Sequence, residues 1–254
     1  MMRLLKIELL KLLPYKTFRV LFLIYLVLLF CILLVADNFF DIPSVLQFPN
    51  LWNYYTCLGA FINIILGIII IFITCNEITY RTLRQNVIDG LTRTEVVLSK
   101  IYLIVFFAVV ITLFLFITGL IAGSINGTIE GGGNFTDHSE FLFAFFIQVL
   151  GVMSLAFLLG NLFKRSAIAI ILFLVFLFPV DLVLREAILP DGSGDYLPVS
   201  TYFLKLLPVP MDHLRSHGDE PTQNLPTVLS MGVGAVYVVI FFLLNLFMIR
   251  RRDL

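Results

Sequence analysis

Residues 101–123 read IYLIVFFAVVITLFLFITGLIAG, and no charged side chain interrupts them. A helix needs roughly 20 apolar residues to cross the hydrocarbon core of a bilayer, so this stretch is long enough to span a membrane. The strands of a membrane barrel alternate apolar and polar residues, which this run does not do. Backbone polar groups in lipid must be satisfied within the segment itself, and the run therefore predicts a transmembrane α-helix.

The whole chain has the same apolar character. Of its 254 residues, 60% are hydrophobic and 13% are charged, and the mean hydropathy is +1.02. Soluble domains carry about 25% charged residues, so a soluble globular enzyme is excluded, and no nucleic-acid partner is expected. The predicted fold is an all-α integral membrane protein with one transmembrane domain over residues 1–254. Its six predicted spans are residues 20–36, 55–74, 101–123, 141–163, 167–184 and 228–249.

The charged residues are distributed unevenly among the segments that flank these spans. Segments on one predicted side hold 14 of the 17 Lys and Arg residues but only 5 of the 17 acids, which gives +9 there against −9 on the other side. Lys and Arg accumulate in cytoplasmic segments. Both ends of the chain are therefore predicted to lie in the cytoplasm.

Residues 1–19 are basic and partly amphipathic, with leucines on one helical face and Arg3 and Lys11 on the other. This pattern predicts a helix that lies in the membrane interface, with its cations facing the lipid headgroups. Pro14 is expected to bend or end that helix. The alternative is a basic flanking segment without defined structure.

Residues that could carry chemistry are few. His213 and His217 have a spacing that suits a metal on a helix, but Gly218 and Pro221 argue against the helix, so no metal site is expected. The chain has no Gly-rich loop ending in Gly-Lys-Ser or Gly-Lys-Thr, the pattern that cradles phosphates. We therefore expect no cofactor and no ATP hydrolysis in this chain alone.

Several polar residues lie inside the predicted spans. Asp181 is the only acid among them, and Arg185 four residues later favours a local ion pair. Intramembrane acids are also candidates for function by default. The uncharged members of the group either join helices by hydrogen bonds or line a path, and the sequence leaves both alternatives open. They are Asn63, Gln148, Asn161 and Asn245.

The segment between the second and third predicted spans carries a recognisable order of residues. Glu77 is followed by YRTLRQN at residues 80–86, DGLTR at residues 89–93, and Lys100. This order resembles the loop after the second span in permeases of ATP-binding-cassette (ABC) transporters, in the type-2 exporter superfamily. Residues 80–82 depart from the family pattern, which often has Gly before Thr. Within the superfamily, the chain is most similar to small bacterial permeases of the bacitracin-resistance and sodium-export type.

The resemblance implies a fold like that of the human ABCG exporters, in which two six-span subunits face each other. It also implies a second copy or a close homologue, and a cytosolic ABC ATPase dimer that holds ATP and Mg. The ATPase would dock on the N-terminal helix and on a coupling helix at about residues 83–97. The residues implied at this ATPase-coupling interface are Glu77, Arg81, Thr82, Arg84, Asp89, Gly90, Arg93 and Lys100.

The long outer segment, residues 185–226, would hold an extracellular gate or a re-entrant helix, with Tyr202, Phe203 and Leu204 as gate candidates. Residues 201–207 within it are apolar enough to contact the membrane. Long loops of this kind often carry function.

The expected function is therefore the permease subunit of an ATP-driven exporter in a bacterial cytoplasmic membrane. Its substrate would be a lipid, a peptide antibiotic or another amphipathic molecule. The main alternative is a membrane scaffold or assembly subunit that moves no substrate. An intramembrane enzyme ranks third, because the predicted spans carry no pair of buried acids, no Ser–His pair and no metal cluster.

Overall fold

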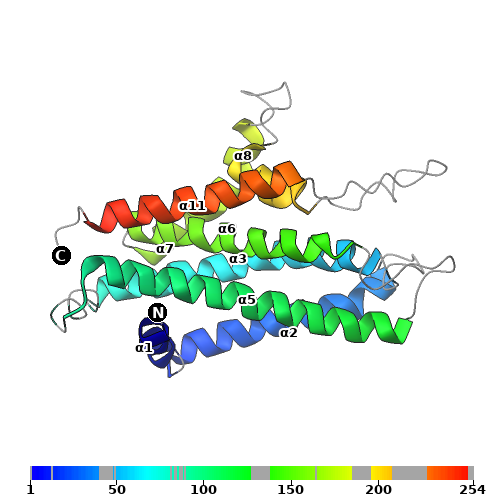
Figure 1. Cartoon of the computed structure of the whole chain (residues 1–254), viewed down its shortest axis with the longest axis horizontal. Coiled ribbons are helices and arrows are strands. Elements are labelled where there is room, and N and C mark those ends of the chain that lie inside the picture. Colours follow the sequence, from blue (N-terminus) through cyan, green and yellow to red (C-terminus); the bar gives the residue numbers. More distant parts are fainter. Residues whose placement is uncertain are drawn as a thin grey trace.

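The computed structural model describes residues 2–12, 14–39, 48, 50–80, 82, 85, 88, 90–126, 138–163, 165–184, 196–207 and 228–250. Within these residues the regular structure is helical, and no β-strand is formed. The long helices run side by side along the long axis of the molecule (Figure 1).

Four helices are long and apolar enough to cross a membrane. They are α3 (Asn50–Thr79), α5 (Arg93–Asn126), α6 (Glu140–Phe163) and α11 (Val228–Arg250). A fifth span is reached if α2 (Lys16–Phe39) is counted together with α1 (Met2–Leu12), from which it is bent by 91°. These helices confirm an all-helical chain of membrane-spanning character. Both α3 and α5 extend beyond their predicted spans at each end, because a helix continues past the hydrocarbon boundary wherever its backbone bonds are kept.

The predicted span at residues 167–184 is built differently from the others. Helix α7 (Ser166–Val175) runs into a π-helical turn, η1 (Phe176–Val180), and then into the single turn α8 (Asp181–Val183). Pro179 has no backbone N–H to donate, and a widened turn accommodates the missing bond. The apolar helix covers Ser166–Phe178, about 20 Å at 1.5 Å per residue, against a hydrocarbon core of roughly 30 Å. A sixth span is therefore not confirmed.

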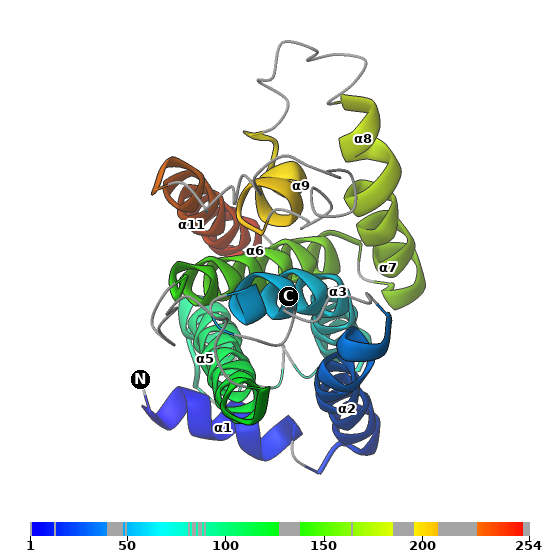
Figure 2. The same cartoon turned by 90° about the vertical axis from the view of Figure 1, so that its right-hand side faces the viewer.

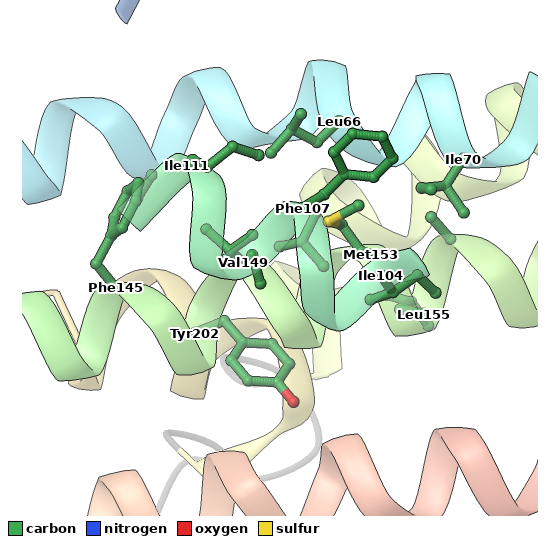
Figure 3. Packing of buried hydrophobic residues seen from close by; sticks show 14 of the residues in the cluster. Leu66, Ile70, Ile104, Phe107, Ile111, Phe145, Val149, Met153, Leu155 and Tyr202 are labelled. Atoms are coloured by element: carbon green, nitrogen blue, oxygen red, sulfur yellow. The ribbon is translucent and has the colours of Figure 1, made fainter. Parts of the chain in front are cut away.

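Helix α6 is at the centre of the bundle, where it packs against α3, α5, α7 and α11. Most of its side chains are buried, as expected for a helix that is apolar on every face. Figure 3 shows the core between α3, α5 and α6, with Leu66 of α3, Phe107 of α5 and Met153 of α6 lying close together.

The segments that hold most of the Lys and Arg residues lie together at one end of the helix bundle. Helix α1, the connection from α3 to α5, the turn from α6 to α7 and the C-terminal end of α11 lie at the left end of the bundle in Figure 1. These segments hold the excess of Lys and Arg, and we call this the basic end. Figure 2 shows α1 lying crosswise to the long helices, the orientation expected of a helix in the membrane interface.

Part of the long segment before α11 folds back onto the bundle. Helix α9 (Pro198–Ser200) and the π-helical turn η4 (Thr201–Lys205) form its described core. Turn η4 packs against α3, α6 and α11. Tyr202, Leu206 and Leu207 are buried there, so the apolar stretch at residues 201–207 covers the helices of its own chain.

Candidate functional site

Three charged side chains meet where α1 crosses the basic end. Lys100 of α5 donates hydrogen bonds to the carboxylates of both Glu8 of α1 and Glu77 of α3. Ser99 Oγ donates a further bond to Glu8 Oε1 at 3.0 Å, and Lys11 Nζ lies 3.9 Å from the same oxygen. We call Glu8, Glu77 and Lys100 the clamp, because it joins three elements that are far apart in the sequence.

The clamp is buried as well as charged. Only 5% of the Lys100 side chain, 3% of Glu8 and 14% of Glu77 are exposed, and buried charges of this kind are tolerated only when they are paired. Burial alone would raise the pKa of Glu8. The positive charge and hydrogen bond of Lys100 outweigh burial, so the pKa of Glu8 lies below its ordinary value. Glu8 is therefore ionised at neutral pH and holds α1 through charge-assisted hydrogen bonds.

A capping box fixes the start of α5. The backbone N–H of Thr92 donates to the Glu95 carboxylate at 2.8 Å, and the N–H of Glu95 donates to Thr92 Oγ1 at 3.3 Å. These reciprocal bonds satisfy donors that the first helical turn would leave unpaired. Gly90, just before the box, has a φ of 97°, which glycine adopts without strain. A Thr followed three residues later by Glu is the sequence signature of such a box, so Thr92 and Glu95 mark this helix start in the sequence.

The described members of the predicted coupling set differ in burial and position. Glu77 and Lys100 belong to the clamp and are too buried for direct contact with a partner protein. Thr82 Oγ1 donates to the backbone carbonyl of Glu77 at 3.2 Å, and Arg93 is exposed in the first turn of α5. The remaining members lie outside the described residues, and they are Arg81, Arg84 and Asp89.

The predicted coupling helix at residues 83–97 is wrong as a single continuous helix. The turn at Gly90 and the non-helical residues 91 and 92 interrupt it. Residues 93–97 belong to α5, which begins at Arg93. The physical reason is the left-handed backbone of Gly90 together with the capping box, which starts a new helix in a new direction.

A cavity of about 410 Å³ adjoins the clamp between the end of α1 and the end of α3, and we call it the α1–α3 cavity. Its walls are mostly apolar, with a cation and a carboxylate among them. Tyr15 stacks on Phe72 with ring centroids 6.2 Å apart, and its hydroxyl accepts a hydrogen bond from Asn76 Nδ2 at 3.0 Å. The lining residues are Lys11, Leu12, Tyr15, Ile73, Asn76, Glu77, Tyr80, Thr82 and Gln85.

Tyr202, the first predicted gate residue, is buried between two helices. A Cβ atom built on Gly151 of α6 would lie 2.1 Å from Tyr202 Cζ, so the ring rests directly on this glycine. The hydroxyl donates to the carbonyl oxygen of Gly234 in α11 at 2.9 Å. Figure 3 shows the ring between α6 and α11, with its oxygen directed toward α11. Tyr202 is therefore a buried anchor of the segment.

The other two gate candidates border a second cavity, of about 240 Å³, between α3, η1 and η4. The rings of Phe203 and Phe61 are 5.9 Å apart at its edge, and Leu204 is partly exposed beside them. Asp181 also lines this cavity, and its carboxylate accepts hydrogen bonds from the hydroxyl and the backbone N–H of Ser200. The predicted partner of Asp181, residue 185, lies outside the described residues.

Residues 38–254 match the model of a family described as proteins of unknown function, DUF2705. The chain belongs to this family. No curated protein matches it. The DUF2705 match begins within α2, so it includes Glu77 and Lys100 of the clamp and leaves Glu8 outside.

In this DUF2705 chain, the four uncharged polar residues singled out within the predicted spans are hydrogen-bonded between helices. Tyr25 donates to Asn63 at 2.8 Å, and Asn63 donates to Gln148 at 2.6 Å, which links α2, α3 and α6. Asn161 of α6 donates to Asn245 of α11 at 2.7 Å. Of the two alternatives left by the sequence, joining helices is the one that the contacts support.

Within the described part of the chain, His, Cys, Asp and Glu residues form no group of three that could hold a metal ion. His213 and His217 lie outside the described residues. The chemistry at the basic end is therefore that of charge pairing and of a partly apolar cavity beside it.

Proposed function

We propose that this chain is the membrane-spanning permease subunit of an ATP-driven exporter, with ATP and Mg held by a separate cytosolic ABC ATPase dimer. The observation that carries the proposal is the clamp. The segment between α3 and α5 starts just after Glu77 and leads, through the capping box, to Lys100, which bonds both to Glu77 and to Glu8 of α1. A force applied to this segment would therefore reach three elements at once.

Such an arrangement suits a membrane subunit whose movements are driven by a separate ATPase. Coupling between two sites requires an element whose state both sites can bias, and α1, α3 and α5 move together only while the clamp is closed. In this proposal Arg93, exposed at the start of α5, contacts the ATPase, together with Arg81, Arg84 and Asp89. Glu77 and Lys100 transmit the force from these residues without contacting the ATPase, because they are buried.

The remaining parts of the proposal follow from the charge distribution and from the resemblance. The chain would reside in the cytoplasmic membrane of a bacterium, with its basic end and both ends of the chain in the cytoplasm. Residues 166–184 would complete a sixth span with a second copy or a homologue packed against them. The apolar cavity beside Phe203 and Leu204 favours an amphipathic substrate over a bare ion.

The test uses the full chain in proteoliposomes together with a candidate ABC ATPase, chosen from any that its gene neighbourhood encodes. Wild-type protein should stimulate ATP hydrolysis. Arg93→Glu should reduce that stimulation by about tenfold, because one interfacial charge contact is worth roughly 1.5–3 kcal/mol. A glutamate in the first turn of a helix is electrostatically favourable, so the variant should fold.

Arg165→Glu is the matched control, since Arg165 is also exposed at the basic end but lies between α6 and α7. It should stimulate the ATPase as the wild type does. Equal stimulation by all three proteins would count against the coupling role of this segment. A stable complex with the ATPase that never moves a substrate would favour a scaffold or assembly subunit instead.

A further inference from the structure

We propose that the α1–α3 cavity binds the headgroup of an ethanolamine phospholipid from the surrounding membrane. The volume of about 410 Å³ falls within the range of roughly 300–1,000 Å³ that small-molecule pockets occupy. The inference needs only a membrane-embedded chain, so it is independent of the proposed export function.

The position of the cavity fits a lipid. Helix α1 is bent by 91° from α2 and crosses the ends of the long helices (Figure 2), at the level where headgroups lie. Leu12, Ile73 and the ring of Tyr15 form an apolar wall, against which the first carbons of the acyl chains can pack. Tyr80 at the rim is 74% exposed, so the cavity is approachable from outside.

The charges around the cavity fit a zwitterion. Lys11 and Glu77 both line it, so a cation and a carboxylate face the same space and can pair with the phosphate and the ammonium of one headgroup. The four charged groups of the clamp region, Glu8, Glu77, Lys100 and Lys11, sum to zero. A zwitterionic headgroup matches this pairing of one cation with one carboxylate, whereas an anionic lipid without an ammonium offers no partner to Glu77.

The hydrogen-bonding groups distinguish ethanolamine from choline. Lys100 bonds to Oε1 of Glu77, and a carboxylate has a second oxygen that can accept from a ligand. A primary ammonium donates three N–H bonds, while a trimethylammonium donates none. Tyr15 accepts from Asn76, so its own hydroxyl proton can be donated to a phosphate oxygen. The site therefore favours phosphatidylethanolamine over phosphatidylcholine.

Native mass spectrometry of the full chain tests the proposal directly. The protein is released from mixed micelles with equal amounts of phosphatidylethanolamine, phosphatidylcholine and phosphatidylglycerol, without any ATPase. We expect preferential retention of phosphatidylethanolamine. Lys11→Met should reduce that retention by about tenfold, because a charge-assisted contact is lost. Lys6→Met is the matched control, since Lys6 is exposed on the same helix but does not line the cavity, and it should retain the lipid as the wild type does.

Equal retention of the three lipids, a preference for phosphatidylglycerol, or equal loss in both variants would overturn the proposal. A second measurement avoids any folding defect of Lys11→Met. A photoreactive phenylalanine analogue placed at exposed Tyr80 should cross-link phosphatidylethanolamine in native membranes. Cross-linking to a protein instead would assign the cavity to a partner. Because neither readout uses ATP, failure here leaves the export proposal intact, and failure of ATPase stimulation leaves this proposal intact.

Discussion

Lys100 is the only described cation that bonds to both carboxylates of the clamp. Removing Lys100 alone should therefore lower the free energy of unfolding more than neutralising all three clamp side chains. Lys100→Met leaves two carboxylates buried side by side, and we expect a loss of about 3–5 kcal/mol in the free energy of unfolding. The triple variant that adds Glu8→Gln and Glu77→Gln should recover a large part of that loss. Denaturant unfolding in micelles measures both, and a triple variant less stable than Lys100→Met would contradict the ion-pair account.

The depressed pKa of Glu8 makes the position of α1 dependent on pH. A carboxyl group whose folded pKa lies below its unfolded value of about 4.5 stabilises the fold fully above that value. The stabilisation is lost as the pH falls through the folded pKa. Spin labels at exposed Leu10 and Val105 should report one α1–α5 distance from pH 8 to about 5. The distribution should broaden only as the pH falls below about 4.5 and through the lower pKa of folded Glu8. Broadening between pH 8 and 6 would refute this, and Glu8→Gln should be broad throughout.

At the residue scale, the sequence shows which residues are charged or polar, but it does not show which distant residues they contact. It placed Glu77 and Lys100 at one functional region, and they do meet. It indicated no role for Glu8, since the partner of Glu8 is 92 positions away. Helical periodicity reports which residues share a face within about one turn, and it carries no information about contacts between distant helices.

At the scale of elements, the contact of Tyr202 with Gly151 should control how the segment at residues 198–207 docks. Gly151→Ala places a methyl group within 2.1 Å of the tyrosine ring, and we expect a loss of about 1–3 kcal/mol from overpacking. In a Tyr202→Ala background the same change should cost little, because the ring is gone. Thermal unfolding of the four proteins gives the coupling energy.

Gly232→Ala is the control for helix propensity, because a Cβ atom there meets nothing within 4 Å. It should leave stability unchanged or raise it by about 0.5 kcal/mol. A similar loss at both glycines would show that the helix backbone, and not the tyrosine, is responsible.

Elements were predicted well where a single physical requirement decides them. Long uncharged runs specify α3, α5, α6 and α11, because lipid forces backbone polar groups into helices. The connection between α3 and α5 was predicted less well, since one left-handed glycine and one capping box redirect the chain there. Proline's missing N–H accounts for an interruption at Pro179, whereas the π-helical geometry of the turn depends on packing.

At the scale of the whole molecule, the sorting of charges predicts which end faces the cytoplasm. The native cysteines are buried or half-buried, so a new exposed cysteine can be labelled selectively. Arg165→Cys, at the basic end, should react with a membrane-impermeant maleimide only after the membrane is opened. Ser139→Cys, exposed at the start of α6, should react in intact cells. The reverse pattern would invert the assigned topology.

The clamp also orders events during synthesis. Glu8 leaves the ribosome 92 residues before Lys100, which at about 5–20 residues per second is a delay on the order of 5–20 s. Throughout that interval α1 has a carboxylate without its cation, and its apolar face can rest only on the lipid surface. Docking of α1 becomes favourable once α3 and α5 stand beside each other with their ends at the same depth. Helix α1 is thus made before α3 and α5 but docks after them, and its docking depends on their correct insertion.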